Sequence, residues 1–426
     1  MSISMLGLPL LLVLFLMGIP VVYSLLATSL FIMFFSTGIQ WVSISQYMVN
    51  GLNTFTILSA PLFLLAGTIM NSCGITARLF QFARVCIGWL PGGLGHVNVA
   101  ASFIFAGMSG TAIADATGLG LIEIQAMEDA GYDKDFSCAV TSASSSLGPI
   151  IPPSMPLVVY GTVSGASVGA LFIAGVVPGV LMALLMMALV TVFAIKRKYP
   201  RDKFPTFKEF LLGCKDGFFP VLTPVIILLG IYTGLFTPTE SAAVVVVYSI
   251  FLGVVVYRQL GIKDIVNCFR TSVVDVVAIC ILVAAATLFG TVIVRALIPQ
   301  TIVSWFVGFL SNKYIFLIIL NLLLLVVGMF METVSAITIL TPIIVPVALA
   351  FDVNLVQLGV IMVLNLMIGV ISPPFGVVLF AINKVGSIPI ARLIKALIPW
   401  YACLGAALLA VTFIPALTTW LPALMK

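Results

Sequence analysis

Residues 141–154 read TSASSSLGPIIPPS, and residues 365–374 read NLMIGVISPP. Both stretches lie inside long apolar segments, and each carries a glycine shortly before a Pro-Pro pair. Proline lacks the N–H group that a helix needs, and its ring clashes with the preceding turn. Because a regular helix cannot continue through either stretch, the sequence predicts two discontinuous helices, over residues 136–161 and 355–382.

The two stretches belong to a longer repeat with an offset of 221 residues, since 328 − 107 and 373 − 152 both equal 221. The residues that recur at this offset are Gly107-Met108 as Gly328-Met329, Thr117 as Thr338, Gly148 as Gly369, and Pro152-Pro153 as Pro373-Pro374. We therefore predict two copies of one unit, 1–195 and 220–426, joined by a polar linker at 196–219. Helix interruptions at matching positions of two halves are the best sequence pointer to a transport site in a membrane protein.

The composition is that of an all-α polytopic membrane protein. The chain is 62% hydrophobic and 8% charged, whereas soluble domains are about 25% charged. Many segments reach the roughly 20 apolar residues that a spanning helix needs. We read the segment from Leu6 to Phe35 as membrane helix and not as a cleaved signal peptide, because it lacks a basic start and a clean cleavage site.

Several other classes of protein are excluded. The net charge of +5 comes from loop residues and forms no basic face, so nucleic acid is not an expected partner. The seven cysteines are scattered without CxxC spacing, which argues against a disulfide framework or a zinc site. No Walker A motif is present, so ATP is not the expected energy source.

Two further segments, 95–130 and 314–350, are predicted to be re-entrant helical hairpins. Each has about 36 residues, too few for two spans of roughly 20 residues and a turn. Their tips would be Ser109-Gly110-Thr111 and Met331-Glu332-Thr333. Non-helical backbone at membrane depth is tolerated only where it is buried in protein or lines a wet cavity. An ordinary kinked helix pair is the alternative.

The distribution of Lys and Arg predicts that the second copy is inverted. These residues favour cytoplasmic loops. With the 196–219 linker in the cytoplasm and the copies inverted, only Arg295, Lys313 and Lys426 of the 19 basic residues fall on the outer side. A parallel repeat would require the linker to cross the membrane.

The breaks themselves predict cation sites. A broken helix frees backbone carbonyls, and serine and threonine hydroxyls crowd beside them, so a hard cation needs no carboxylate there. Such helices bind Na⁺ with their carbonyls, while their positive N-terminal ends face anionic substrate groups. We expect Na⁺ at Ser144, Ser145 and Gly148 near the first tip, and at Thr333, Asn365 and Gly369 near the second. The full set of candidate substrate and ion ligands is Ser109, Gly110, Thr111, Asp115, Ser144, Ser145, Ser146, Gly148, Pro149, Glu332, Thr333, Asn365, Gly369 and Ser372.

A packing kink with small serine side chains is the alternative interpretation of each break. Among the charges within or near apolar stretches, Asp115 and Glu332 lie close to the tips and are expected to shape or gate the site. Glu123 is also within such a stretch. Glu240 follows Thr237-Pro238-Thr239 and is interpreted as an acid at a helix start. Arg295 is expected at the outer interface, and His96, beside a glycine-rich turn, as a structural residue.

Specific motifs resemble the large membrane subunit of TRAP (tripartite ATP-independent periplasmic) transporters, over nearly the whole chain. The matching residues are Gly107–Asp115, Glu128–Asp133, Ser146–Pro156, Tyr160-Gly161, Gly328–Glu332 and Ile371–Gly376. The segments Gly92–Asn98 and Leu121–Met127 look more like the sialic-acid members. An acidic residue would be expected at both hairpin tips, but this chain has Thr111 at the position equivalent to Glu332, so the two ion sites need not be equivalent.

The resemblance implies an elevator-type secondary transporter of the bacterial inner membrane, driven by Na⁺, with a fixed scaffold and a moving transport domain. It also implies a separate small four-helix membrane subunit and a periplasmic binding protein that delivers a small organic anion, either sialic acid or a C4-dicarboxylate. Amphipathic helices would connect scaffold and mover at the membrane surface, at 41–53, 78–89, 262–274 and 390–397.

Two other classes compete with this hypothesis. An ion channel could use the same hairpins as pore helices. A membrane hydrolase would need a nucleophile or an acid–base pair, and His96 is the chain's one histidine, so we expect no enzyme.

Overall fold

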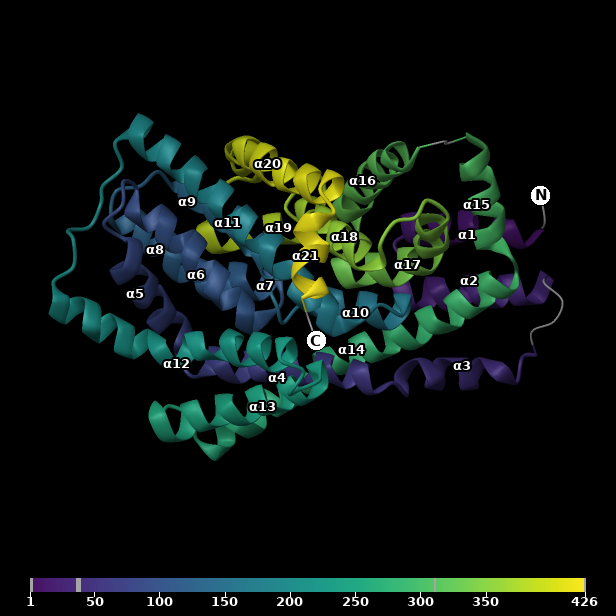
Figure 1. The fold of residues 1–426 in the computed structure, drawn as a ribbon, viewed down its shortest axis with the longest axis horizontal. Helices are drawn as coiled ribbons and strands as arrows, with labels where there is room; N and C mark the ends of the chain where they lie inside the picture. Colours follow the sequence, from purple (N-terminus) through teal and green to yellow (C-terminus); the bar gives the residue numbers. More distant parts are fainter. Residues whose placement is uncertain (1–2, 36–39, 310–311, 425–426) are drawn as a thin grey trace.

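The computed structural model describes residues 3–35, 40–309 and 312–424, which form helices and no strand (Figure 1). In these ranges, 8 helices are long and apolar enough to cross a membrane. The predicted all-helical, multi-pass membrane protein is therefore confirmed. Lys426, used in the charge map, lies outside the described residues.

The helices follow one order twice. In the first half they are α1 (Gly7–Leu16), α2 (Val21–Phe35), α3 (Ser43–Leu52), η2 (Phe55–Leu58), α4 (Ser59–Ser72), α5 (Ile75–Ile87), α6 (Gly93–Ser109), α7 (Ala112–Ala114), η3 (Asp115–Leu119), α8 (Gly120–Asp129), α9 (Lys134–Ser144), η4 (Ser145–Leu147), α10 (Met155–Ser164) and α11 (Val168–Arg197). In the second half they are α12 (Phe207–Tyr232), α13 (Pro238–Phe251), η5 (Leu252–Val256), α14 (Ile262–Arg295), α15 (Ile298–Phe309), α16 (Lys313–Phe330), α17 (Thr333–Ala350), α18 (Leu355–Val370), α19 (Val377–Gly386), α20 (Ile390–Phe413) and α21 (Ala416–Ala423).

The offset of 221 residues also relates the helix boundaries. At this offset, residues 112–129, which form α7, η3 and α8, correspond to residues 333–350, which are the bounds of α17. Helix α6 corresponds to α16, α9 to α18, α10 to α19 and α11 to α20, each within a few residues. The repeat, which was first seen in the positions of glycine and proline residues, thus extends to the order of the helices.

The helices pack in two layers, each built from both halves (Figure 1). The long-helix layer comprises α1–α5 and α12–α15, in which α14 packs against α2, α3 and α4, and α13 packs against α4. The broken-helix layer comprises α6–α11 and α16–α21, in which α18 packs against α16, α17 and α20. The layers meet where α6 contacts α5, α4 and α12, and where α17 contacts α15 and α14.

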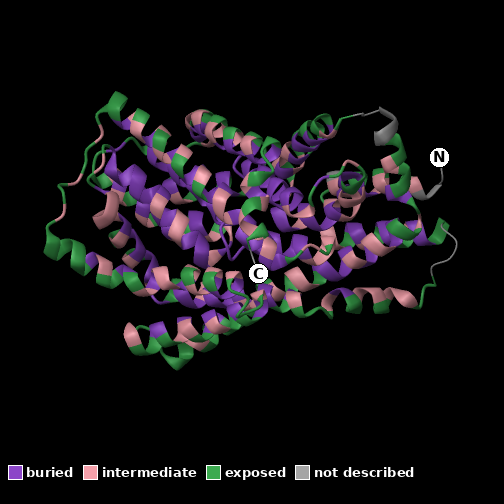
Figure 2. Cartoon of the chain, viewed as in Figure 1, coloured by how far each residue is buried: buried purple, intermediate pink, exposed green. Residues whose placement is uncertain are grey.

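Burial is concentrated in the broken-helix layer (Figure 2). Every residue of α18 from Gln357 to Val370 is buried. A helix that is apolar on all sides belongs in the interior of a large or membrane-embedded body. The outer faces of α12, α13 and α14 instead expose large apolar side chains such as Leu229, Val247 and Val277, as helices facing lipid do.

Three expected boundaries differ from the structure. The amphipathic segment 262–274 and the span that follows it form one helix, α14, because no breaker separates them. The same holds for 390–397 in α20, where Pro399 is accommodated inside the helix. Of the polar run 196–219, only 198–206 is non-helical, because a capping box of Thr206 and Glu209 starts α12 at Phe207.

Two of the connections that join the layers, at residues 88–92 and 198–206, are tied together. The Arg84 guanidinium binds both carboxylate oxygens of Asp202, at 2.7 and 3.0 Å, and the backbone N–H of Asp202 donates to the carbonyl of Gly88. The Tyr132 hydroxyl donates to the carbonyl of Pro200 at 2.8 Å. Two connections far apart in sequence are therefore held as one unit.

Ion pairs also join helices within the broken-helix layer at this end. Arg392 of α20 lies 2.8 Å from Asp135 of α9, and Arg197 of α11 lies 2.8 Å from Asp133. The Tyr199 hydroxyl donates to Asp133, and this bond together with Arg197 holds the pKa of that carboxyl below its ordinary value. The contacts fix the ends of α9, α11 and α20 relative to one another.

Candidate ion and substrate site

The first discontinuous helix breaks as the sequence predicts. Helix α9 ends at Ser144, a short 3₁₀ turn follows over Ser145–Leu147, and α10 starts at Met155. The new helix start is capped by Ser154, whose hydroxyl accepts from the N–H of Leu157. The peptide bonds Pro152-Pro153 and Pro373-Pro374 are both cis.

The serines beside this break use their hydroxyl protons locally. Ser145 donates to the carbonyl of Ser142 at 2.9 Å, and Ser146 donates to that of Ala143 at 2.6 Å. Both hydroxyl oxygens keep lone pairs, so both can still act as acceptors for a ligand.

The first tip sits directly on the first break. A Cβ placed on Gly148 would lie 3.0 Å from both the carbonyl carbon and the oxygen of Thr111. A Cβ placed on Gly110 would lie 2.6 Å from the carbonyl oxygen of Pro153. The structure therefore brings the tip, Gly148 and Pro153 together, which is the arrangement that the predicted first Na⁺ site requires.

The second break is held from two sides. Helix α18 ends at Val370 and α19 starts at Val377, and between them the Tyr401 hydroxyl donates to the carbonyl of Ile371 at 2.8 Å. The Ser372 hydroxyl donates to the carbonyl of Ile368 at 2.6 Å. A Cβ on Gly369 would lie 2.5 Å from the Cα of Gly328, so the end of α16 lies against the end of α18.

Thr111 and Glu332 occupy the same place in the two halves and have the same structural role. Thr111 is the N-cap of α7 and accepts from the N–H of Ala114 at 3.3 Å. Glu332 is the N-cap of α17 and accepts from the N–H of Ser335 at 3.1 Å. The sequence mismatch at the tips therefore preserves a helix cap while adding a carboxylate to the second tip only.

Asp115 and Glu123 form a buried acidic pair in the first hairpin. Their side chains are 1% and 0% exposed, and none of their carboxylate oxygens has a hydrogen-bond partner within the described ranges. Asp115 opens the π segment Asp115–Leu119. In a regular helix, residues seven apart lie on the same face. The π turn holds one extra residue, so Asp115 and Glu123, which are eight apart, lie on the same face here. The second hairpin has Ala336 and Ile344 at the equivalent positions, so this pair is particular to the first.

Sequence reasoning missed two asparagines that make polar contacts behind the breaks. Asn98 of α6 binds Thr141 and Ser144 of α9, and Asn321 of α16 binds Asn365 of α18 and Thr412 of α20. Each of these asparagines stands in an apolar helix, which is the signal that could have singled them out, since polar side chains in membrane helices bind across to neighbours.

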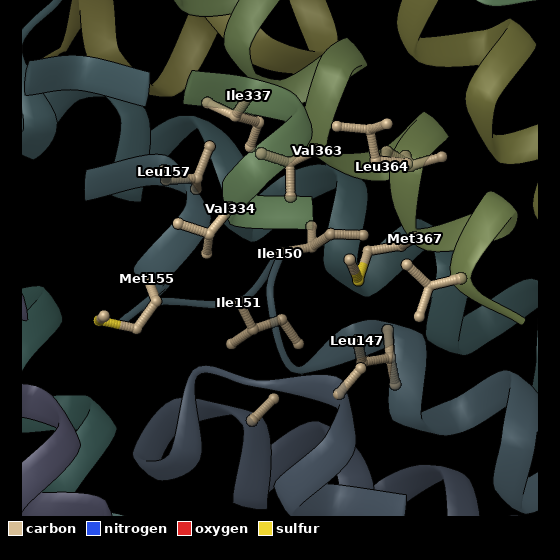
Figure 3. Packing of buried hydrophobic residues seen from close by; sticks show 14 of the residues in the cluster. Leu147, Ile150, Ile151, Met155, Leu157, Val334, Ile337, Val363, Leu364 and Met367 are labelled. Carbon is tan, nitrogen blue, oxygen red and sulfur yellow. The ribbon is translucent and has the colours of Figure 1, made fainter. Parts of the chain in front are cut away.

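Apolar packing joins the breaks of the two halves (Figure 3). Ile150 and Ile151 of the first break lie beside Val334 at the start of α17, and Val363 and Met367 of α18 complete the cluster. The two candidate ion sites therefore belong to one packed body.

His96 and Glu240, for which the sequence predicted structural roles, each contact a neighbouring threonine. His96 lies 3.2 Å from the Thr191 hydroxyl, between α6 and α11. Glu240 closes a capping box with Thr237 at the start of α13, where its carboxylate accepts from the Thr237 N–H at 2.8 Å.

We expect Glu240→Gln to leave uptake and its cation dependence unchanged. Loss of a cap costs typically about 1 kcal/mol, and Gln retains an acceptor, so the melting temperature of the purified protein should fall only slightly. Uptake assays beside a thermal melt test this, and a variant that folds normally but fails to transport would show that Glu240 acts in transport.

The ligands available at the breaks suit a hard monovalent cation. Within the described ranges no group of three His, Cys, Asp or Glu side chains could hold a metal ion. The breaks offer carbonyl and side-chain oxygens instead, and the Oδ1 atom of Asn365, on a residue that is 0% exposed, is buried with no hydrogen-bond partner. An orphaned buried acceptor of this kind fits Na⁺ at the predicted second site.

An all-helical membrane body in which each of two interrupted helices lies beside the tip of a helix–turn–helix has the architecture of a secondary transporter. The family model described as "Tripartite ATP-independent periplasmic transporter, DctM component" matches residues 8–417. The chain therefore belongs to the family of TRAP transporter large permeases. Transporters of this family work with a small membrane subunit and a periplasmic binding protein.

Individual relatives agree with this assignment. The chain is 41% identical over 409 residues to the sialic acid TRAP transporter large permease protein SiaM of Vibrio cholerae, covering 96% of this chain and 95% of that one. It is 38% identical to the C4-dicarboxylate TRAP transporter large permease protein DctM of Pseudomonas aeruginosa, with 86% of each covered. These relatives are transporter permeases, and the chain is likewise not an enzyme.

Solved structures show the same fold at low identity. The YdaH transporter of Alcanivorax borkumensis superposes with a TM-score of 0.67 at 14% identity, over 89% of this chain and 87% of that one. MtrF of Neisseria gonorrhoeae superposes with a TM-score of 0.67 at 12% identity, over 92% of each chain.

Proposed function

We propose that the chain is the large membrane subunit of a Na⁺-coupled importer in the bacterial inner membrane, which takes up a small carboxylated solute, preferably sialic acid. The observation that carries the Na⁺ proposal is the seating of the Gly110-Thr111 tip on the oxygen-rich break at Gly148–Pro153. Freed carbonyls and hydroxyls give the oxygen ligands that such broken helices use for Na⁺.

The solute is proposed from the relatives and from the chemistry of the helix ends. Helices α7 and α17 begin at the two tips, and the positive N-terminal end of a helix stabilises a carboxylate. The greater identity to the sialic acid permease favours sialic acid, and a C4-dicarboxylate is the alternative.

The mechanism that we propose is an elevator, in which the broken-helix layer moves against the long-helix layer as a transport domain against a scaffold. The two copies are inverted in the membrane, and α6–α8 and α16–α17 are re-entrant hairpins. Support comes from the many contacts within each layer and from the connections at 88–92 and 198–206, which are tied to each other. A small four-helix subunit completes the scaffold, and a periplasmic binding protein delivers the solute.

Uptake by proteoliposomes that contain both membrane subunits, with the binding protein added, tests the function. We expect sialic acid uptake with an inward Na⁺ gradient and loss of nearly all uptake when choline replaces Na⁺. Uptake that is unchanged in choline would end the Na⁺ proposal. Uptake inhibited by succinate but not by unlabelled sialic acid would identify the dicarboxylate alternative, and single-channel currents without the binding protein would favour a channel.

A further inference from the structure

Each half of the molecule contains a chain of three polar side chains behind its break, with a threonine at one end and an asparagine in the middle. The two threonines stand on different helices, α9 and α20, and the two asparagines are 223 residues apart, so these members are not equivalent in the repeat. In the first half the chain runs Thr141, Asn98, Ser144, and in the second it runs Thr412, Asn321, Asn365. Ser144 and Asn365 are equivalent in the repeat, since 365 − 144 is 221. Each stands four residues before the glycine of its break.

The threonine at the start of each chain fixes the orientation of the asparagine. The Thr141 hydroxyl donates to the carbonyl of Ser137 at 2.8 Å, and the Thr412 hydroxyl donates to that of Leu408 at 2.7 Å. Because each hydroxyl proton is used within its own helix, the oxygen can only accept from the asparagine. The Nδ2 groups of Asn98 and Asn321 accordingly face Thr141 and Thr412, at 2.7 and 3.0 Å.

With Nδ2 so placed, the Oδ1 atom of each asparagine must face the residue before the break. The Asn98 Oδ1 accepts from the Ser144 hydroxyl at 2.8 Å. The Asn321 Oδ1 accepts from the Asn365 Nδ2 at 2.7 Å, and the Asn321 carbonyl accepts from the same Nδ2 at 3.0 Å. The donors of Ser144 and Asn365 are thereby occupied. The Ser144 hydroxyl also lies 3.2 Å from the carbonyl of Thr141, which is a second acceptor for its proton.

The remaining acceptors are the atoms that a cation would use. Ser144 also accepts from the Ser102 hydroxyl at 3.1 Å, which leaves its oxygen one further lone pair. The Asn365 Oδ1 is buried with no partner. A buried unsatisfied acceptor costs free energy, and a cation bound at the break would satisfy this one.

We propose that Asn98 and Asn321 are positioning residues for Na⁺, which hold the donors of Ser144 and Asn365 away from the ion and leave their oxygens free to bind it. The inference rests on the proposed Na⁺ coupling and adds residues that do not themselves touch the ion. Without Asn98, the Ser144 hydroxyl keeps only its longer bond to the Thr141 carbonyl, at 3.2 Å. Without Asn321, the Asn365 amide can turn its NH₂ group toward the break, where it would repel a cation.

The test compares Asn98→Leu and Asn321→Leu with wild type, by the NaCl concentration that gives half of the thermal stabilisation of the purified protein, relative to choline chloride. One orienting hydrogen bond contributes about 1 kcal/mol, so we expect the half-saturating Na⁺ concentration to rise about fivefold in each variant. In proteoliposomes, the half-saturating Na⁺ for uptake should rise equally, while the maximal rate at saturating Na⁺ is largely retained.

Two further sets of variants keep the test decisive. Thr141→Val and Thr412→Val remove only the anchor that orients each asparagine, so they should shift the same quantity less, and they serve if a leucine variant fails to fold. Ser249→Ala is the control for the loss of a buried polar side chain, because Ser249 is 0% exposed and its hydroxyl donates to the carbonyl of Val245 within α13, away from both breaks. It should leave the Na⁺ dependence unchanged.

The proposal is overturned if the asparagine and threonine variants keep the wild-type Na⁺ dependence, or if Ser249→Ala shifts it equally. A wild-type protein that Na⁺ neither stabilises nor drives would overturn the proposed function itself, and that result is read from the wild type alone.

Discussion

Gly110→Ala is expected to abolish solute uptake and to destabilise the protein. Gly110 has φ of +61°, and a side chain in this left-handed conformation costs about 1–2 kcal/mol. The added Cβ would also lie 2.6 Å from the carbonyl oxygen of Pro153, a backbone atom of the break. The tip would have to move away from the break, and the predicted first Na⁺ site would lose the side that the tip provides.

Gly405→Ala is the control for this experiment. Gly405 lies in α20, and a Cβ added there would meet no atom within 4 Å, so alanine should be neutral or slightly stabilising. Uptake and thermal melts of both variants in the same vesicles check the expectation. Wild-type uptake by Gly110→Ala would show that the tip does not close on the break.

Gly369→Ala is expected to cause a comparable loss in the second half. Its Cβ would lie 2.5 Å from the Cα and carbonyl carbon of Gly328, so two helix backbones must separate. Overpacking of this kind costs typically about 1–3 kcal/mol. The variant should melt at a lower temperature and lose most of the stabilisation that Na⁺ gives.

Gly328→Ala, on the other side of the same contact, should have a milder effect and provides an internal comparison. A Cβ on Gly328 would lie 3.1 Å from both the Cα of Gly369 and the carbonyl oxygen of Leu366, a contact that small shifts can relieve. Melting temperature and Na⁺-induced stabilisation should therefore rank wild type, Gly328→Ala and Gly369→Ala in falling order. Equal behaviour of all three would mean that the end of α16 does not pack on the second break.

The positions of the breaks and tips could be predicted from the sequence because they depend on local chemistry. Pro152-Pro153 and Pro373-Pro374 interrupt a helix wherever they occur. The tips at 109–111 and 331–333 interrupt apolar segments that are too short for two full membrane spans and a turn. The structure has breaks at all four places.

Contacts between distant elements could not be predicted. That Asn98 meets Ser144, or Asn321 meets Asn365, depends on the register between two packed helices, which apolar periodicity does not encode. The π segment at Asp115–Leu119 has no sequence signature comparable to proline. The continuity of α14 was missed because a change from an amphipathic to an apolar pattern alters what surrounds a helix, not whether the helix continues.

The common role of Thr111 and Glu332 shows a third kind of limit. Their side chains differ in charge, so the sequence suggested two different tips, yet both accept from the backbone of the helix that follows. A substitution can preserve a cap and change the electrostatics of a site at the same time. The acidic pair Asp115 and Glu123 adds to the difference between the halves.

The central claim is that the two breaks, each served by a neighbouring hairpin, bind Na⁺ that enters with the solute. The most direct measurement is the uptake of radioactive sodium by proteoliposomes containing both membrane subunits, with and without the solute-loaded binding protein. We predict sodium entry that depends on the solute in wild type and that Gly110→Ala abolishes. Solute entry without accompanying sodium would contradict the claim.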